Sequence, residues 1–173
     1  VSDKAGNPAS VDHNLTVDVT VPAVTINTIA GDDVINVAEH SQAHVISGTA
    51  TGAAAGDKVT VTIGGQTYTT VLDAAGNWSV GVPASVISGL SDGTVTVTAS
   101  VTDAAGNTGT GSHNVTVDTG LPSVSFNAIS DDNVLNAVEK GQDLSVSGTS
   151  ANLAEGTVVT VTLNGKNYTE IGR

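Results

Sequence analysis

The sequence repeats itself with a period of 100 residues and without a gap. Residues 1–20, VSDKAGNPASVDHNLTVDVT, align with residues 101–120, VTDAAGNTGTGSHNVTVDTG, and this register holds to the end of the chain. Roughly 31 of about 73 superposable pairs are identical, which indicates a tandem array of one module. We therefore expect the end of one module at 1–20, a complete module at 21–120 and the first part of a following module at 121–173.

Composition excludes several classes of function. The chain has 17 acidic and five basic residues, a net charge of −12, and no cysteine. The acidic balance argues against binding of nucleic acid, which needs a clustered basic face. The sequence contains no run of 18 apolar residues, so we do not expect this segment to insert into a membrane. The absence of cysteine excludes disulfides. Nothing arranges a nucleophile, a base and an orienting residue together, so we do not expect an enzyme.

Alternation of Val or Ile with Thr at every second position predicts β-strands with one buried face. The complete module contains seven such segments, at about 23–29, 44–50, 58–63, 66–72, 77–82, 94–102 and 113–118. Glycine-rich turns separate them, and one short helical turn fits residues 37–43. Seven short strands in about 100 residues predict an all-β immunoglobulin-like (Ig-like) sandwich, with Trp78 in its core. A proline before each first strand makes the linkers short, so the sandwiches are expected to follow one another end to end.

Acidic residues recur at fixed positions of the repeat. The loop between the first and second strands (residues 30–43, the AB loop) carries Asp32, Asp33 and Glu39, and the last strand of the module ends at Asp118 near the same pole. The following module repeats this loop with Asp132 and Glu139. At the opposite pole, Asp103 faces Asp18 of the incoming linker, together with Asp57 and Asp73.

Hard oxygen ligands in such numbers are typical of calcium sites, so the pattern predicts Ca²⁺ as a cofactor. The alternative is that these are solvated loop residues, with Asx turns at Asp32 and Asn36. A zinc site is not expected, because only His40 and His44 of the four histidines are close in sequence.

These motifs together resemble the bacterial Ig-like tandem repeats of giant adhesins exported by type I secretion. That family includes Bap-like biofilm-associated surface proteins and the large non-fimbrial adhesins of the Salmonella type. The resemblance rests on VPAVTINTIAGDDVINVAEH and the strands that follow it, on DAAGNWSVGVPA and on SVTDAAGNTGTGSHNVTVDT, and it covers the whole chain. It implies a secreted, cell-surface stalk whose modules are stiffened by Ca²⁺ at or near their junctions.

Carried over by position, the resemblance implies Asp32, Asp33, Glu39 and Asp118 as ligands at one junction. Asp132 and Glu139 match in the following module, where Asn133 replaces the second aspartate and weakens the site. Asp18 marks the preceding junction. The implied partners are calcium, the neighbouring repeats, and a host cell or biofilm matrix that other regions of the protein contact.

Two further functions compete with the stalk. The sandwich could bind a host glycan or protein directly, although aromatic residues make up only 2% of the chain. The Thr-x-Thr runs could form an ice-binding surface, although short twisted strands argue against a flat array. Residues 121–173 supply only the first four strands of their module, and we hypothesise that such partial modules are frayed or pair between copies through exposed sheet edges.

Overall fold

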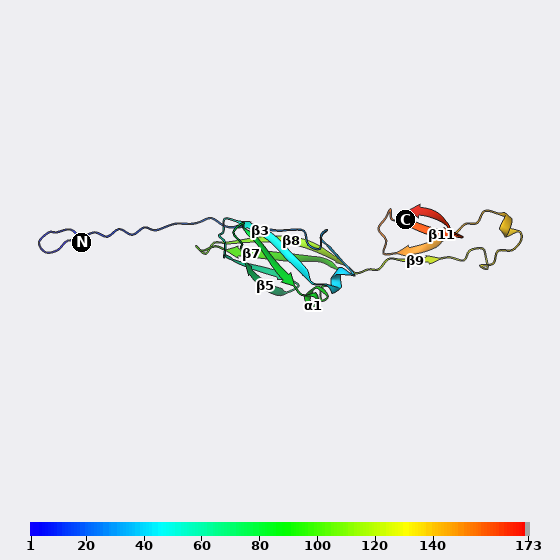
Figure 1. The fold of residues 1–173 in the computed structure, drawn as a ribbon, viewed down its shortest axis with the longest axis horizontal. Coiled ribbons are helices and arrows are strands. Elements are labelled where there is room, and N and C mark those ends of the chain that lie inside the picture. Colours follow the sequence, from blue (N-terminus) through cyan, green and yellow to red (C-terminus); the bar gives the residue numbers. More distant parts are fainter. Residues whose placement is uncertain (172–173) are drawn as a thin grey trace. The chain divides into compact units, whose positions relative to one another are not determined.

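The computed structural model describes residues 1–171, and the chain divides into two compact units, Val1–Val117 (unit 1) and Asp118–Arg173 (unit 2). Unit 1 contains a sandwich of two sheets, coloured from cyan to green in Figure 1. The architecture is all-β and Ig-like, as the spacing of the Val and Thr residues predicts. No helix among residues 1–171 is long and apolar enough to cross a membrane.

The larger sheet of unit 1 has five strands. Their order across the sheet is β2 (Val34–Asn36), β8 (Thr108–Asp118), β7 (Gly93–Thr102), β4 (Lys58–Ile63) and β5 (Gln66–Val71). The alternating pattern produces the expected two faces. Val59, Val61 and Val97 are fully buried, whereas the threonines between them face outward and are exposed or half-buried.

The smaller sheet has three antiparallel strands, in the order β1 (Ala23–Ile26), β3 (His44–Thr51) and β6 (Asn77–Val82). The expected strand at 23–29 is therefore shorter, because the chain leaves this sheet after Ile26 and enters the other sheet as β2. This crossing adds an eighth strand that the sequence pattern did not predict. The last strand, expected at 113–118, begins earlier, at Thr108.

Aliphatic side chains from both sheets fill the core, and no polar residue of the described chain is buried. Trp78 is 3% exposed and lies in β6, which confirms its expected place in the core. The predicted helical turn is the 3₁₀ helix η1 (Glu39–Ser41), and a short helix α1 (Ala84–Ile87) precedes β7. Gly64 and Gly65 have φ angles of 56° and 76°, as the tight hairpin between β4 and β5 requires.

Unit 2 repeats the early part of this arrangement. Its elements are β9 (Ser123–Phe126), η2 (Glu139–Gly141), β10 (Gly148–Ala151), β11 (Val158–Leu163) and β12 (Lys166–Ile171). β9 pairs with β10 and β11 with β12, in the register of their counterparts 100 residues earlier. For example, Val161 pairs with Tyr168 as Val61 pairs with Tyr68. The sequence repeat is therefore a structural repeat.

Candidate metal centre

The AB loop is anchored to β8 through Asp33. Its backbone is left-handed, with φ 63°, and its Oδ1 accepts the N–H of Ile29 at 2.8 Å and lies 2.7 Å from Nε2 of His113. The Asp33 carbonyl accepts the N–H of Thr116 at 2.9 Å. The bond from Ile29, followed by that from His113, holds the pKa of the Asp33 carboxyl below its ordinary value. The AB loop and the end of β8 thus share one pole, as expected.

The other polar residues of the AB loop also have local roles. Oδ1 of Asp32 accepts the N–H of Val34 at 3.0 Å, which is the expected Asx turn. Asn36 and Glu39 hold the turn that leads into η1 through reciprocal bonds: Oδ1 of Asn36 accepts the Glu39 N–H at 3.1 Å, and Oε2 of Glu39 accepts the Asn36 N–H at 3.1 Å. The local folding of the loop therefore accounts for one oxygen of each carboxylate.

The same contacts recur in unit 2. Oδ1 of Asp132 accepts the N–H of Val134 at 2.9 Å, and Oε2 of Glu139 accepts the N–H of Asn136 at 3.0 Å. Asn133, with φ 61°, accepts the N–H of Ile129 at 2.7 Å through its side-chain oxygen. The asparagine therefore preserves the loop bond of Asp33, while it lacks the negative charge that a cation or a protonated histidine would need.

At the opposite pole, Asp57 accepts the N–H of Ala54 at 2.7 Å, and a self-contained turn accounts for Asp73 and Asp103. In the D-x-x-G-N segments that begin at Asp3, Asp73 and Asp103, the carboxylate accepts both the backbone and the side-chain N–H of the asparagine four residues later. These bonds lower the pKa of all three carboxyls, and for Asp103 the largest contribution is the Asn107 side chain. Both oxygens of Asp103 thus already have partners.

The two linkers carry one turn in common. Oδ1 of Asp18 accepts the N–H of Thr20 at 2.9 Å, and Oδ1 of Asp118 accepts the N–H of Gly120 at 3.0 Å. In unit 1, Nδ2 of Asn107 also donates to the carbonyl of Asp18 at 3.1 Å. The structure therefore brings the incoming linker next to the turn that contains Asp103, at the pole where both were expected.

The donor set fits calcium in its chemistry. Six carboxylates each keep a second oxygen with no protein donor among residues 1–171: Asp18, Asp32, Glu39, Asp118, Asp132 and Glu139. Within these residues, however, no three His, Asp or Glu side chains are close enough together to hold a metal ion. Since Ca²⁺ takes six to eight oxygens, an ion at either pole would need main-chain carbonyls and water in addition to carboxylates.

The two histidines near the AB loop bind main-chain carbonyls. Nε2 of His40 lies 2.9 Å from the Leu90 carbonyl, and Nε2 of His44 lies 3.0 Å from the Glu39 carbonyl. The first contact joins the AB loop to the segment between α1 and β7. The Nε2 contacts of His40 and His44 therefore hold the backbone at Leu90 and at Glu39 in place.

A sandwich of this topology with acidic loops at its poles, whose early part recurs 100 residues later in the chain, defines an Ig-like repeat domain. Residues 20–119 match the family of bacterial Ig-like domains, and the chain belongs to that family. A comparison with curated proteins gave no match.

Similar solved structures come from large bacterial adhesins. One is a Ca²⁺-stabilised adhesin that helps an Antarctic bacterium to bind ice (41% identity, TM-score 0.52, covering 98% of this chain and 43% of that one). Another is from a 1.5-MDa bacterial ice-binding adhesin and concerns host cell-surface retention (36% identity, TM-score 0.52, covering 98% of this chain and 57% of that one). A third is a tetra-tandem repeat from the extending region of a large adhesion protein (30%, TM-score 0.51, covering 98% and 42%). The chain thus spans about half of the length of these structures and is similar to adhesin repeat domains.

Proposed function

We propose that these repeats are spacer modules in the stalk of a bacterial cell-surface adhesin, with Ca²⁺ at their acidic poles. In this role they are not enzymes. They are secreted, and they carry an adhesive region away from the cell, in support of adhesion or biofilm formation. We also propose that one module ends at residue 20, that a complete module spans residues 21–120, and that the following module begins at residue 121. Similarity to repeat domains of large adhesins, one of them Ca²⁺-stabilised, supports it.

The observation that carries the proposal is the recurrence of one acidic turn at both linkers. Asp18 and Asp118 each use one oxygen to hold the linker backbone and leave the other oxygen available. Each linker then reaches a proline, Pro22 or Pro122, which restricts the backbone just before the next strand. A linker of this kind has few accessible conformations.

Calcium would act on this linker through charge. The chain carries a net charge of −12, so neighbouring acidic poles repel one another where modules meet. An ion held by Asp118 with Asp32, Asp33 and Glu39, or by Asp18 with Asp103, would neutralise the pole and limit bending. Asp132 and Glu139 would serve the following module, where Asn133 contributes an amide oxygen in place of a carboxylate.

Small-angle X-ray scattering of the full chain tests this function. We expect chelation of calcium by EDTA to broaden the distance distribution, and addition of calcium to narrow it again. Asp118→Asn should reduce the calcium response, whereas Asp143→Asn, which removes an exposed charge outside the proposed ligands, should not. Identical scattering with calcium and with EDTA would contradict the proposal.

A further inference from the structure

The sandwich of unit 1 has a long, open edge at β5. This strand is the last of the five-stranded sheet, and among residues 1–171 it pairs only with β4. Leu72, the residue that follows β5, donates its N–H to the Asp57 carbonyl at 3.0 Å and accepts the Gly56 N–H at 2.9 Å, so its backbone faces the β4 side. Backbone groups of successive residues face opposite sides of a strand, so those of Thr67 and Thr69 face away from β4. These groups are available to another strand.

The other edges of this sandwich are short, covered or weakened. β2 has only three residues and lies in the acidic AB loop. The carbonyls of Pro22 and Val24 in and before β1 lie against Gly109 and Gly111 of β8. β6 contains Gly81, and a glycine weakens strand pairing. By contrast, the six residues of β5, QTYTTV, include no charge and no proline, which commonly keep an edge from pairing.

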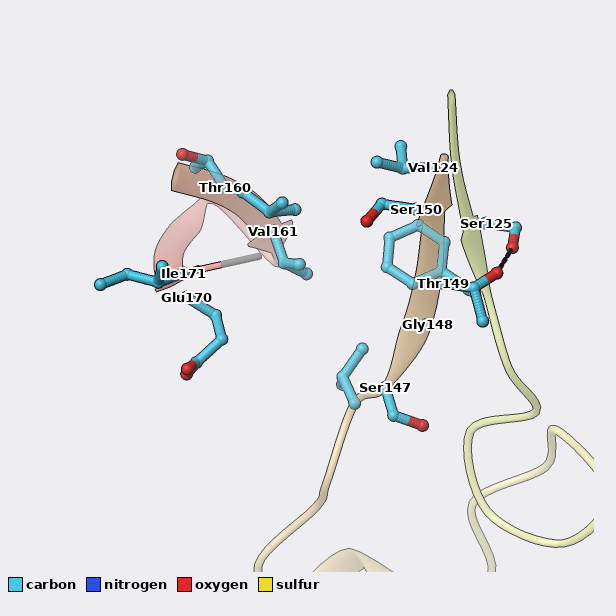
Figure 2. A pocket seen from close by; sticks show the side chains of 13 residues that line it. Val124, Ser125, Ser147, Gly148, Thr149, Ser150, Thr160, Val161, Glu170 and Ile171 are labelled. Atoms are coloured by element: carbon cyan, nitrogen blue, oxygen red, sulfur yellow. Dashed lines mark hydrogen bonds between the residues drawn. The ribbon is translucent and has the colours of Figure 1, made fainter. Parts of the chain in front are cut away.

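The counterpart of β5 in unit 2 indicates what such an edge pairs with. β12 reads KNYTEI, with Lys166 two residues before Tyr168 and Glu170 two residues after it. Figure 2 shows Glu170 and Ile171 leaving β12 on opposite sides, so Lys166, Tyr168 and Glu170 share one side of the strand. When two copies of this strand run antiparallel about a two-fold axis at the tyrosine, each lysine lies opposite a glutamate, and opposite charges in this position stabilise a sheet. The charge pattern of the repeat is therefore complementary to itself.

We propose that the β5 edge of one copy of this chain pairs antiparallel with the β5 edge of a second copy, about a two-fold axis at Tyr68. In this register Thr67 of each copy lies opposite Thr69 of the other, and their outward backbone groups form the hydrogen bonds of the ladder. The two five-stranded sheets become one continuous sheet. β5 carries no charge, so the contact opposes no like charges although the chain has a net charge of −12.

The contact is weak for one module and stronger for an array. Six residues of edge strand bury little surface, so a pair of single modules is transient. The segment recurs with the 100-residue repeat, and contacts made side by side along an array reinforce one another through effective concentration. The two-fold axis reverses one copy relative to the other, which would join stalks from facing cells; this last step alone rests on the proposed function. The pairing needs no calcium, which distinguishes it from the calcium response proposed for the poles.

Disulfide trapping in EDTA tests the contact and its register, because the chain has no cysteine of its own. The full-chain variants Thr67→Cys and Thr69→Cys are mixed under mild oxidation, with one of them isotope-labelled so that mass spectrometry identifies mixed dimers. We expect mixed dimers to form several-fold faster than dimers of either variant alone. The control pair, Thr96→Cys and Thr98→Cys, has the same spacing and is also exposed, but it lies in β7 inside the sheet and should cross-link only at the rate of random collision. Cross-linking of the β5 pair no faster than the control, or fastest within one variant alone, would overturn the proposal.

Amide hydrogen exchange measured by nuclear magnetic resonance tests the backbone pairing. The Thr67 amide of the full chain in EDTA should exchange more slowly as the concentration rises. Thr69→Pro removes an outward N–H and leaves the bonds to β4, so it should abolish this protection, whereas Thr69→Ala should keep it. Protection of the Tyr68 amide in both variants shows that the hairpin remains folded. Exchange at Thr67 that is independent of concentration in the wild type, or protection that persists in Thr69→Pro, would contradict pairing at this edge.

Discussion

Oδ1 of Asp33 lies 2.7 Å from Nε2 of His113, and this contact joins the AB loop to β8 across 80 residues of sequence. It occurs where the chain has just crossed from the three-stranded to the five-stranded sheet. The same oxygen accepts the Ile29 N–H, and Ile29 and Ile35 on either side of the crossing are buried. Asp33 therefore fixes the crossing in place, independently of any metal.

The first prediction concerns this aspartate. Asp33→Asn should keep most of the thermal stability of unit 1, because Asn133 makes the equivalent loop bond in unit 2. Asp33→Ala should lower the melting temperature further, because alanine cannot accept the Ile29 N–H and tolerates φ 63° poorly. Differential scanning calorimetry of both variants checks this order. Equal melting temperatures for the two variants would show that the loop bond contributes nothing.

The second prediction concerns acid. Hydrogen bonds lower the pKa of the Asp33, Asp73 and Asp103 carboxyls below 3.8 in the folded state. A depressed folded pKa contributes stability that is present above the unfolded pKa and is lost as the pH falls through the folded value. Stability from these groups should therefore be constant above about pH 5 and decline below about pH 4. Circular dichroism melts from above about pH 5 to below about pH 4 measure the decline. The assignment is contradicted if the double variant Asp73→Asn, Asp103→Asn loses as much stability toward acid as the wild type.

The third prediction concerns the contact between β1 and β8. A Cβ on Gly109 would lie 1.7 Å from the carbonyl oxygen of Pro22, so Gly109→Ala must displace the backbone at the start of β1. We expect a loss of about 1–3 kcal/mol, or about 4–8 °C in melting temperature for each kcal/mol. Gly81→Ala is the matched control, because nothing lies within 4 Å of its Cβ. Equal effects of the two substitutions would contradict the close approach.

The fourth prediction separates the two roles open to Glu39. Asn36→Ala removes the acceptor of the Ala38 and Glu39 N–H groups at the turn before η1, and it should cost about 0.5–1.5 kcal/mol with or without calcium. Glu39→Gln keeps an acceptor for the Asn36 N–H but loses the charge. It should therefore match the wild type in EDTA and gain less stability when calcium is added. Thermal melts in both conditions measure this difference, and an equal gain in the variant would remove Glu39 from the proposed ligands.

Strand positions could be predicted well because Val–Thr alternation defines the buried face directly. The segments at 58–63 and 77–82 have the expected bounds. The pattern does not indicate β2, because its three residues lie inside a loop rich in Asp and Asn and pair with β8, a strand distant in sequence. The extension of β8 to Thr108 was missed because glycines interrupt the alternation there, although Gly109 is what allows β1 to pack closely.

The acidic residues could be located from the sequence, but their local bonds were only partly predicted. The structure contains the Asx turns at Asp32 and Asn36 that the alternative to a calcium site includes. The pattern N-x-x-E, from Asn36 to Glu39 and from Asn136 to Glu139, indicates the reciprocal bonds between these side chains and the backbone in both repeats. The contact with His113 could not be predicted, because it depends on how a distant strand packs against the loop. The choice of metal ligands remains a prediction, because ligand geometry depends on how neighbouring modules meet.

Isothermal titration of calcium into the full chain tests the central claim most directly. We predict saturable binding with a Kd near 0.1 mM, in the range of extracellular calcium modules, which at about 1 mM calcium adds about 1.4 kcal/mol of stability per site. The double variant Asp18→Asn, Asp118→Asn should weaken this binding, and Asp143→Asn should leave it unchanged. Heats equal to those of dilution for the wild-type chain would contradict calcium binding at the poles.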